Sequence, residues 1–116
     1  MSTHELLHIA HSLGIALSKT EAWQEVQTAR ENLMRDSDAY QLLARYQDSA
    51  IKIERKTQDG LSITQAEIDN MSSIEEQLAG NALIVALQEA QEKFNQLMQS
   101  VYSTLDQALE GDYDNG

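Results

Sequence analysis

Hydrophobic residues recur every three or four positions through most of this chain, which is the spacing of residues on one face of an α-helix. The longest such run extends from Ala82 to Leu109, and its apolar seam consists of Leu83, Leu87, Ala90, Phe94, Leu97, Val101 and Ala108. At about 1.5 Å per residue, a helix over this run would be roughly 40 Å long. Because so long an apolar seam needs other helices along it, the run predicts association with a further chain.

Four shorter helical patterns precede this run, and they are expected at about 2–17, 19–35, 37–58 and 65–79. A capping-box pattern, Ser or Thr with Glu three residues later, opens three of them, at Ser2, Ser18 and Thr64. Asp36 and Asn81 are expected as N-caps of the remaining helices. The sequence therefore predicts an all-α fold, an elongated helical bundle of about five helices, two of them long.

Glycines are expected to end the helices. Gly60 and Gly80 follow the third and fourth patterns, and Gly111 follows the last one. We expect one helical domain over residues 1–111 and a disordered acidic tail at 112–116.

A second seam with regular spacing lies in the pattern at 37–58 and matches the seam at 82–109. We expect these two helices to form a homodimer or a higher homo-oligomer. The sequence leaves open whether they pair within one chain or between two. The expected interface residues are Leu43, Tyr46, Ala50, Ile53, Leu87, Phe94, Leu97 and Val101. A charge placed at Phe94 or Leu97 should therefore break the assembly.

Composition excludes several classes of function. The chain has no cysteine, so disulfides, thiolate metal sites and cysteine nucleophiles are excluded. Its 19 acidic and eight basic residues give a net charge of -11, which disfavours direct nucleic-acid binding and anionic membranes. Neither a signal peptide nor an apolar run of about 20 residues is apparent. We therefore expect a cytoplasmic protein.

Three histidines near the start of the chain offer the one candidate metal site. His4, His8 and His11 are spaced four and three residues apart, so they share one helix face. Imidazoles one turn apart can chelate zinc or nickel. The stripe lies opposite the apolar face of its helix, which favours a solvated surface. A small metal-binding protein is thus the alternative hypothesis to an interaction protein.

Acidic pairs do not indicate a catalytic site. Glu75 with Glu76, and Glu89 with Glu92, lie on helices where such residues are usually exposed. The sequence supplies no pocket that would shift their pKa values, and it contains no phosphate-binding glycine loop. We expect no enzymatic activity and no cofactor.

A basic stripe flanks the seam of the third expected helix. Arg45, Lys52 and Lys56 either form ion pairs with acidic neighbours across a helix–helix contact, or provide a docking patch. The docking patch would take an acidic protein, or RNA held by such a partner. Trp23, Tyr40 and Tyr102 are expected partly at the surface, where aromatic residues often anchor interfaces.

Several segments together resemble the YlbF/YmcA family of small helical bacterial proteins, including its YheA-like branch. They are SKTEAW at 18–23, DSDA at 36–39, GLSITQAEI at 60–68, NALI at 81–84 and AQEKFNQL at 90–97. The resemblance extends from about His4 to Leu109. It departs from the family at Ala82, where relatives often have proline, and in lacking the cysteines that hold iron–sulfur clusters in some relatives.

This resemblance implies an all-α fold, homo-oligomers and a non-enzymatic regulatory role. Family members act in competence, sporulation and biofilm control, through complexes that adjust RNA processing by ribonuclease Y. It therefore implies that the partners are the chain itself, related family members and the ribonuclease Y machinery. The identity of the partner and the pathway of this chain stay open.

Overall fold

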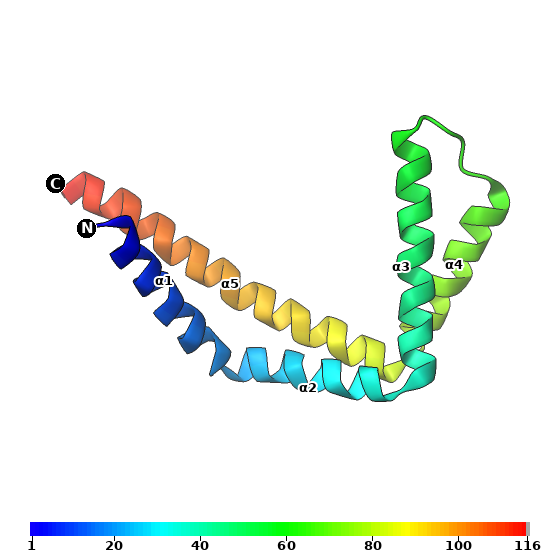
Figure 1. The fold of residues 1–116 in the computed structure, drawn as a ribbon, viewed down its shortest axis with the longest axis horizontal. Helices are drawn as coiled ribbons and strands as arrows, with labels where there is room; N and C mark the ends of the chain where they lie inside the picture. Colours follow the sequence, from blue (N-terminus) through cyan, green and yellow to red (C-terminus); the bar gives the residue numbers. More distant parts are fainter. Residues whose placement is uncertain (116) are drawn as a thin grey trace. The chain divides into compact units, whose positions relative to one another are not determined.

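The computed structural model describes the backbone of residues 1–115 and the side chains of residues 1–111, and its described part is all-α (Figure 1). The five helices are α1 (Thr3–Ser18), α2 (Glu21–Arg35), α3 (Ser37–Gln58), α4 (Gln65–Ala79) and α5 (Ala82–Asn115). The predicted fold class is confirmed, and the bounds of α3 and α4 agree with those expected from the sequence.

Contacts divide the chain into two compact units. Unit 1 contains residues 1–28 and the chain from Glu89 onward, and unit 2 contains Ala29–Gln88. The helices α2 and α5 each contribute residues to both units. A single helical domain over residues 1–111 stays a prediction.

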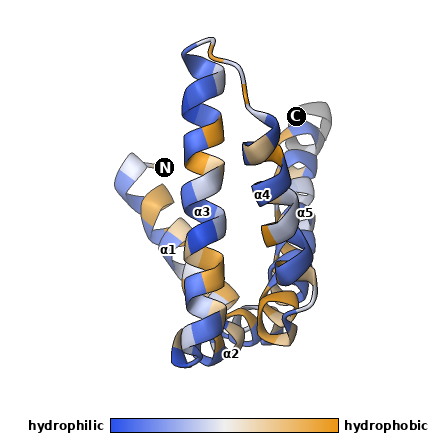
Figure 2. Cartoon of the chain, turned by 90° about the vertical axis from the view of Figure 1, so that its right-hand side faces the viewer, coloured by the Kyte–Doolittle hydropathy of each residue, from blue (hydrophilic) through white to orange (hydrophobic). Residues whose placement is uncertain are grey.

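Unit 2 is built around an antiparallel hairpin of α3 and α4 and contains the larger apolar core. The core residues come from four helices and are Leu33, Ala39, Leu42, Ile74, Leu78 and Ile84. Hydrophobic positions occur along both helices of the hairpin (Figure 2), but its buried core residues lie in the half away from the loop. The first turns of α5 share this core with α3, so part of the apolar seam of each of these two helices is used within one chain in unit 2.

Gly60 shapes the end of α3. Its φ of 71° lies in the left-handed region, which glycine adopts without a steric cost. The amide of Leu61 donates to the Lys56 carbonyl at 2.8 Å, and the amide of Gly60 donates to the Thr57 carbonyl at 3.2 Å. This is a Schellman motif, which satisfies carbonyls that the helix end would otherwise leave unpaired.

Four of the five predicted N-caps are confirmed by hydrogen bonds. The side-chain oxygens of Ser2, Asp36, Thr64 and Asn81 each accept from a backbone amide of the following first turn. The predicted cap at Ser18 is wrong. The Ser18 hydroxyl donates to the Ile15 carbonyl inside α1, and Thr20 instead accepts from the Trp23 amide at 3.2 Å. Therefore α2 begins two residues later than expected.

Unit 1 has a small buried core and one aromatic pair. Val26 and Ala90 are buried in it. The rings of Trp23 and Phe94 lie 5.1 Å apart between centroids and are tilted by 54°, a favourable aromatic arrangement. By contrast, α1 contains no buried residue. Unit 1 therefore leaves one of its helices largely uncovered.

The last helix continues past Gly111, where the sequence predicted its end. The predicted disordered tail at 112–116 lies outside the residues whose side chains are described, and it stays a prediction.

Candidate protein-interaction surfaces

A group of exposed apolar side chains lies on α1 and on the C-terminal part of α5, within unit 1. We call it the neutral apolar surface and define it as Leu6, Leu7, Ile9, Leu13, Tyr102 and Leu105, which are 38–61% exposed. Figure 2 shows hydrophobic positions, in orange, on α1 close to the N-terminus. Leu6, Ile9 and Leu13 share one face of α1. Groups of exposed apolar side chains mark sites of association with other molecules.

The stretches that carry this surface have no formal charge. Residues 6–18 and residues 94–105 contain no Asp, Glu, Lys or Arg, although the whole chain has 27 such residues among its 116. Charged residues are depleted in the centres of protein interfaces. The charge pattern and the exposure thus identify the same two segments.

The two segments meet at a small apolar pocket of about 280 Å³. Leu13 lines it from α1, while Ser100, Val101, Thr104 and Leu105 line it from α5. The pocket shows that the two helices face one another around Leu13.

The predicted interface residues are all half-buried, but they divide between the two units. Leu43, Tyr46 and Leu87 pack against the core of unit 2, so contacts within the chain account for at least part of their burial. Phe94 contacts Trp23 in unit 1. The remaining members are Ala50, Ile53, Leu97 and Val101. Their role between chains stays a prediction.

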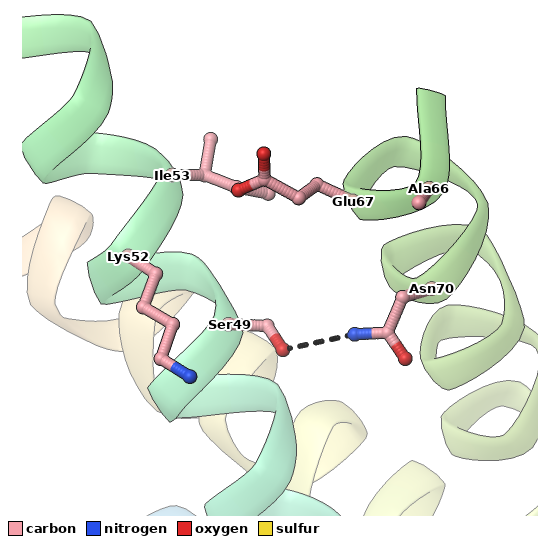
Figure 3. Close-up of a pocket in the computed structure, with 6 residues that line it drawn as sticks. All are labelled: Ser49, Lys52, Ile53, Ala66, Glu67 and Asn70. Carbon is pink, nitrogen blue, oxygen red and sulfur yellow. Dashed lines mark hydrogen bonds between the residues drawn. The ribbon is translucent and has the colours of Figure 1, made fainter. Parts of the chain in front are cut away.

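The basic stripe of α3 faces α4. Arg45 donates to the Gln77 side-chain oxygen at 3.3 Å, and Lys56 forms an ion pair with Glu67. The ion-pair interpretation therefore holds for Lys56. Lys52 lies instead at the edge of a groove of about 310 Å³ between α3 and α4, where the other lining residues are Ser49, Ile53, Ala66, Glu67 and Asn70 (Figure 3).

Three hydrogen bonds converge on the Glu67 carboxylate in this groove. Its Oε1 accepts from the Lys56 ammonium, from the Thr64 amide at 3.1 Å and from the Thr64 hydroxyl at 2.9 Å. The hydrogen bond from Lys56 and the two from Thr64 lower the pKa of Glu67 from 4.5 to about 2. A carboxylate with so low a pKa is a poor general base at neutral pH, so this groove gains no catalytic character from it.

The other candidate acids are exposed. Glu75, Glu76, Glu89 and Glu92 all have exposed side chains. The groove does not include any of them.

The three histidines do not gather into a metal site. His4, His8 and His11 are exposed on α1, and the described residues contain no group of three or more His, Cys, Asp or Glu that could hold a metal ion. The geometry gives no support to the metal-binding alternative. Among the helices of the described chain, none is long and apolar enough to cross a membrane.

Sequence reasoning assigned an apolar face to the first helix but missed that this face is exposed. The signal that could have found the surface is the absence of charge from residues 6–18 and 94–105. In a chain this acidic, charge-free segments that are also apolar are the ones best suited to contact another protein. Tyr40 and Tyr102 are exposed, as expected, whereas Trp23 is half-buried.

Groups of exposed apolar side chains on a helical scaffold are the kind of surface through which small proteins bind other proteins. A family model described as "Control of competence regulator ComK, YlbF/YmcA" matches residues 6–110. The chain belongs to the YlbF/YmcA family.

Relatives in several bacteria support this membership. The chain is 25% identical over 114 residues to a UPF0342 protein of Desulfitobacterium hafniense, with 98% of this chain and 87% of that protein covered. It is 23% identical over 107 residues to a UPF0342 protein of Oceanobacillus iheyensis, with 92% of each covered.

Two solved structures share the fold. A protein of unknown function (DUF964) from Bacillus stearothermophilus has a TM-score of 0.75 at 23% identity, covering 91% of this chain and 93% of that one. Bacillus subtilis RicA, solved in complex with RicF, has a TM-score of 0.78 at 14% identity, covering 97% and 99%. At these identities the similarity concerns the fold.

Proposed function

We propose that this protein is a non-enzymatic, cytoplasmic regulatory adaptor that works through protein–protein contact. The observation that carries the proposal is the neutral apolar surface. Seven large apolar side chains are exposed on two charge-free segments of a chain with a net charge of -11: the six of this surface and Ile15. Such a surface is unfavourable in water unless another protein covers it.

The family supports a regulatory role. Its description links it to the control of competence. The similar chain RicA was solved together with a partner protein, RicF. By analogy, the protein would assemble with itself or with related helical proteins. It would act on competence, sporulation or biofilm formation by adjusting RNA processing through ribonuclease Y.

Two surfaces of the protein would contact partner proteins. The neutral apolar surface and the neighbouring Leu97 and Val101 would provide the main contact, because they combine exposed area with an absence of charge. Lys52, with Arg45 nearby on the same helix, would provide a secondary contact for an acidic partner. Lys56 is excluded from that role because Glu67 already neutralises it.

A deletion strain of the native bacterium tests this proposal. Loss of the gene should change competence, sporulation or biofilm formation, together with the 5′ and 3′ ends of processed transcripts. Wild-type protein should restore the phenotype. The Ile9→Glu variant should fail to restore it, because it places a charge on the neutral apolar surface.

The control is Ile51→Glu, which makes the same substitution at an exposed isoleucine of α3 in unit 2. This variant should complement like wild type. A deletion with no effect on any of these traits, or full complementation by Ile9→Glu, would refute the adaptor role of this surface.

A further inference from the structure

The groove between α3 and α4 contains polar groups that the hairpin itself does not use. Its lining residues all belong to unit 2, and they are Ser49, Lys52, Ile53, Ala66, Glu67 and Asn70. We call it the hairpin groove. A cavity of roughly 150 Å³ can hold a benzene molecule, so the groove of about 310 Å³ has room for small side chains of another polypeptide.

The Lys52 ammonium is available for a ligand. Among the side chains that the structure describes, none forms an ion pair or a hydrogen bond with it. Lys56, one turn further along α3, is by contrast paired with Glu67. Because these two charges offset one another, Lys52 leaves the groove with an excess of positive charge, in a chain whose net charge is -11. An acidic group of a partner is attracted to such a site and repelled by acidic surface elsewhere.

A hydroxyl donor lies beside this ammonium. Ser49 is three residues before Lys52, so the two side chains are neighbours on the surface of α3. The Ser49 Oγ accepts a hydrogen bond from the Asn70 Nδ2 at 3.4 Å, across the groove (Figure 3). Among the described residues no acceptor takes the proton of the Ser49 hydroxyl, so this group can donate to a ligand. Asn70 keeps its side-chain oxygen as an acceptor.

We propose that the hairpin groove binds a short, extended segment of a partner protein through one aspartate or glutamate side chain. The carboxylate of this residue accepts from the Lys52 ammonium and the Ser49 hydroxyl, and a backbone amide next to it donates to the Asn70 side-chain oxygen. A neighbouring aliphatic side chain lies on Ile53 and Ala66. The inference rests on the proposed function, since it names the chemistry of the partner at the secondary contact.

The charges of the hairpin favour a single carboxylate over a phosphate group or a run of acidic residues. Glu67 lines the same groove, and α4 has three further acidic residues, Asp69, Glu75 and Glu76. A dianionic phosphate would meet one available ammonium here, whereas sites for phosphorylated segments usually provide a cluster of arginines. A long acidic run would be repelled by α4. A segment with one acidic residue and an aliphatic neighbour therefore matches the groove best.

A phage-displayed library of random octapeptides provides the probe. The library should be selected on the full wild-type chain and counter-selected on Lys52→Gln, which keeps a good helix former and removes the ammonium. The enriched peptides should contain Asp or Glu next to an aliphatic residue. Enrichment of peptides without an acidic residue, or the absence of any peptide that prefers wild type over Lys52→Gln, would overturn the proposal.

Fluorescence anisotropy then measures the dissociation constant of an enriched peptide, synthesised with a fluorescein label and blocked ends. Lys52→Gln should raise this constant by about tenfold or more, as expected for the loss of a charged hydrogen bond. Lys19→Gln is the matched control, because Lys19 is also exposed and the net charge changes equally, but it lies in unit 1. Equal effects of the two substitutions would show that only overall charge matters, and would refute the site.

Two further changes separate recognition from folding. Ser49→Ala should weaken binding by about threefold to tenfold and keep the helical circular dichroism signal, because alanine favours the helix but has no hydroxyl to donate. Replacing the acidic residue of the peptide by lysine should abolish binding to wild type and restore part of it to Lys52→Glu. If this exchange of charges restores nothing although Lys52→Glu is folded, the peptide does not contact Lys52.

The same variants test other occupants of the groove. A fluorescein-labelled oligouridylate should not bind, because the chain is strongly acidic. Binding of this RNA that is lost in Lys52→Gln would assign the groove to nucleic acid. A lower molar mass of Lys52→Gln than of wild type in sedimentation equilibrium would mean that an acidic segment of another copy fills the groove. Either result would contradict the proposal.

Comparison with the complementation test separates this proposal from the proposed function. If Ile9→Glu fails to complement but no peptide depends on Lys52, the adaptor role stands and the hairpin groove is refuted as a binding site. If peptides bind through Lys52 but deletion of the gene changes none of the traits, the groove stands and the regulatory adaptor role fails.

Discussion

Replacing Ile84 by alanine should strongly destabilise the protein, because Ile84 lies at the centre of the unit 2 core and is only 2% exposed. The substitution removes roughly three methyl or methylene groups. At about 0.8 kcal/mol for each, the lost transfer free energy is about 2.4 kcal/mol.

Two further effects act in opposite directions. The cavity left behind costs additional free energy, which brings such substitutions into the range of about 2–5 kcal/mol. Alanine has a higher helix propensity than isoleucine and returns about half a kcal/mol. The loss of packing outweighs the gain in propensity, so we expect the free energy of unfolding to fall by about 3 kcal/mol.

Ile51→Ala is the matched control in the same unit. Its side chain is about half exposed, so roughly half of the transfer term applies and no enclosed cavity forms. The gain in helix propensity offsets much of the remaining loss. The expected change in the free energy of unfolding is about 0.5 kcal/mol.

Urea denaturation measures both variants. With a slope of about 1–3 kcal/mol per molar urea, the Ile84→Ala midpoint should fall by about 1 M or more. Circular dichroism and the fluorescence of Trp23, the one tryptophan of the chain, should be followed together. Protein concentration must be the same throughout, because association stabilises the folded state. Equal midpoint shifts for the two variants would refute the position of Ile84 in the core.

Two further substitutions test local features of unit 2. Glu67→Gln should destabilise the protein at neutral pH but not near pH 2. The pKa of Glu67 is about 2 in the folded state, against an ordinary value of 4.5. The contribution of its carboxylate to the free energy of unfolding is therefore present above about pH 4.5 and is lost as the pH falls toward 2. A difference between the urea midpoints of wild type and variant that stays constant from pH 6 to about pH 2 would contradict this. Gly60→Ala should lower the free energy of unfolding by about 1 kcal/mol, because φ at this position is 71°, and Gly60→Asn should lower it less. Equal urea midpoints for glycine and alanine would show that the left-handed conformation carries no cost.

Most of the fold could be predicted from the sequence because capping residues and apolar spacing agree with one another. Asp36 and the Thr64–Glu67 capping box give the starts of α3 and α4 without error. At Ser18 the pattern misled, since Thr20 has the same capping chemistry two residues later. Local sequence does not decide which of two competent caps the chain uses.

The interaction surface was harder to predict than the fold. The apolar face of α1 has the same periodicity as a buried helix, so spacing alone does not show that Leu6 or Ile9 is exposed. The core that α3 shares with the start of α5 inside unit 2 was likewise open from sequence, because a helical seam is equally suited to a partner in the same chain or in another. Only the positions of the helices in the structure show whether an apolar face is buried within the chain or left exposed for another chain.

The ion pair between Lys56 and Glu67 has a consequence for the helix dipoles of the α3–α4 hairpin. Lys56 lies in the last turn of α3, where the dipole is negative, and Glu67 lies in the first turn of α4, where it is positive. Each side chain therefore offsets the partial charge of its own helix end while it binds the other. The Lys56–Glu67 pair joins the two helix ends directly. Insertion of a short flexible peptide between Ser62 and Ile63, beyond the hydrogen bond from the Leu61 amide to the Lys56 carbonyl, should therefore cost little stability.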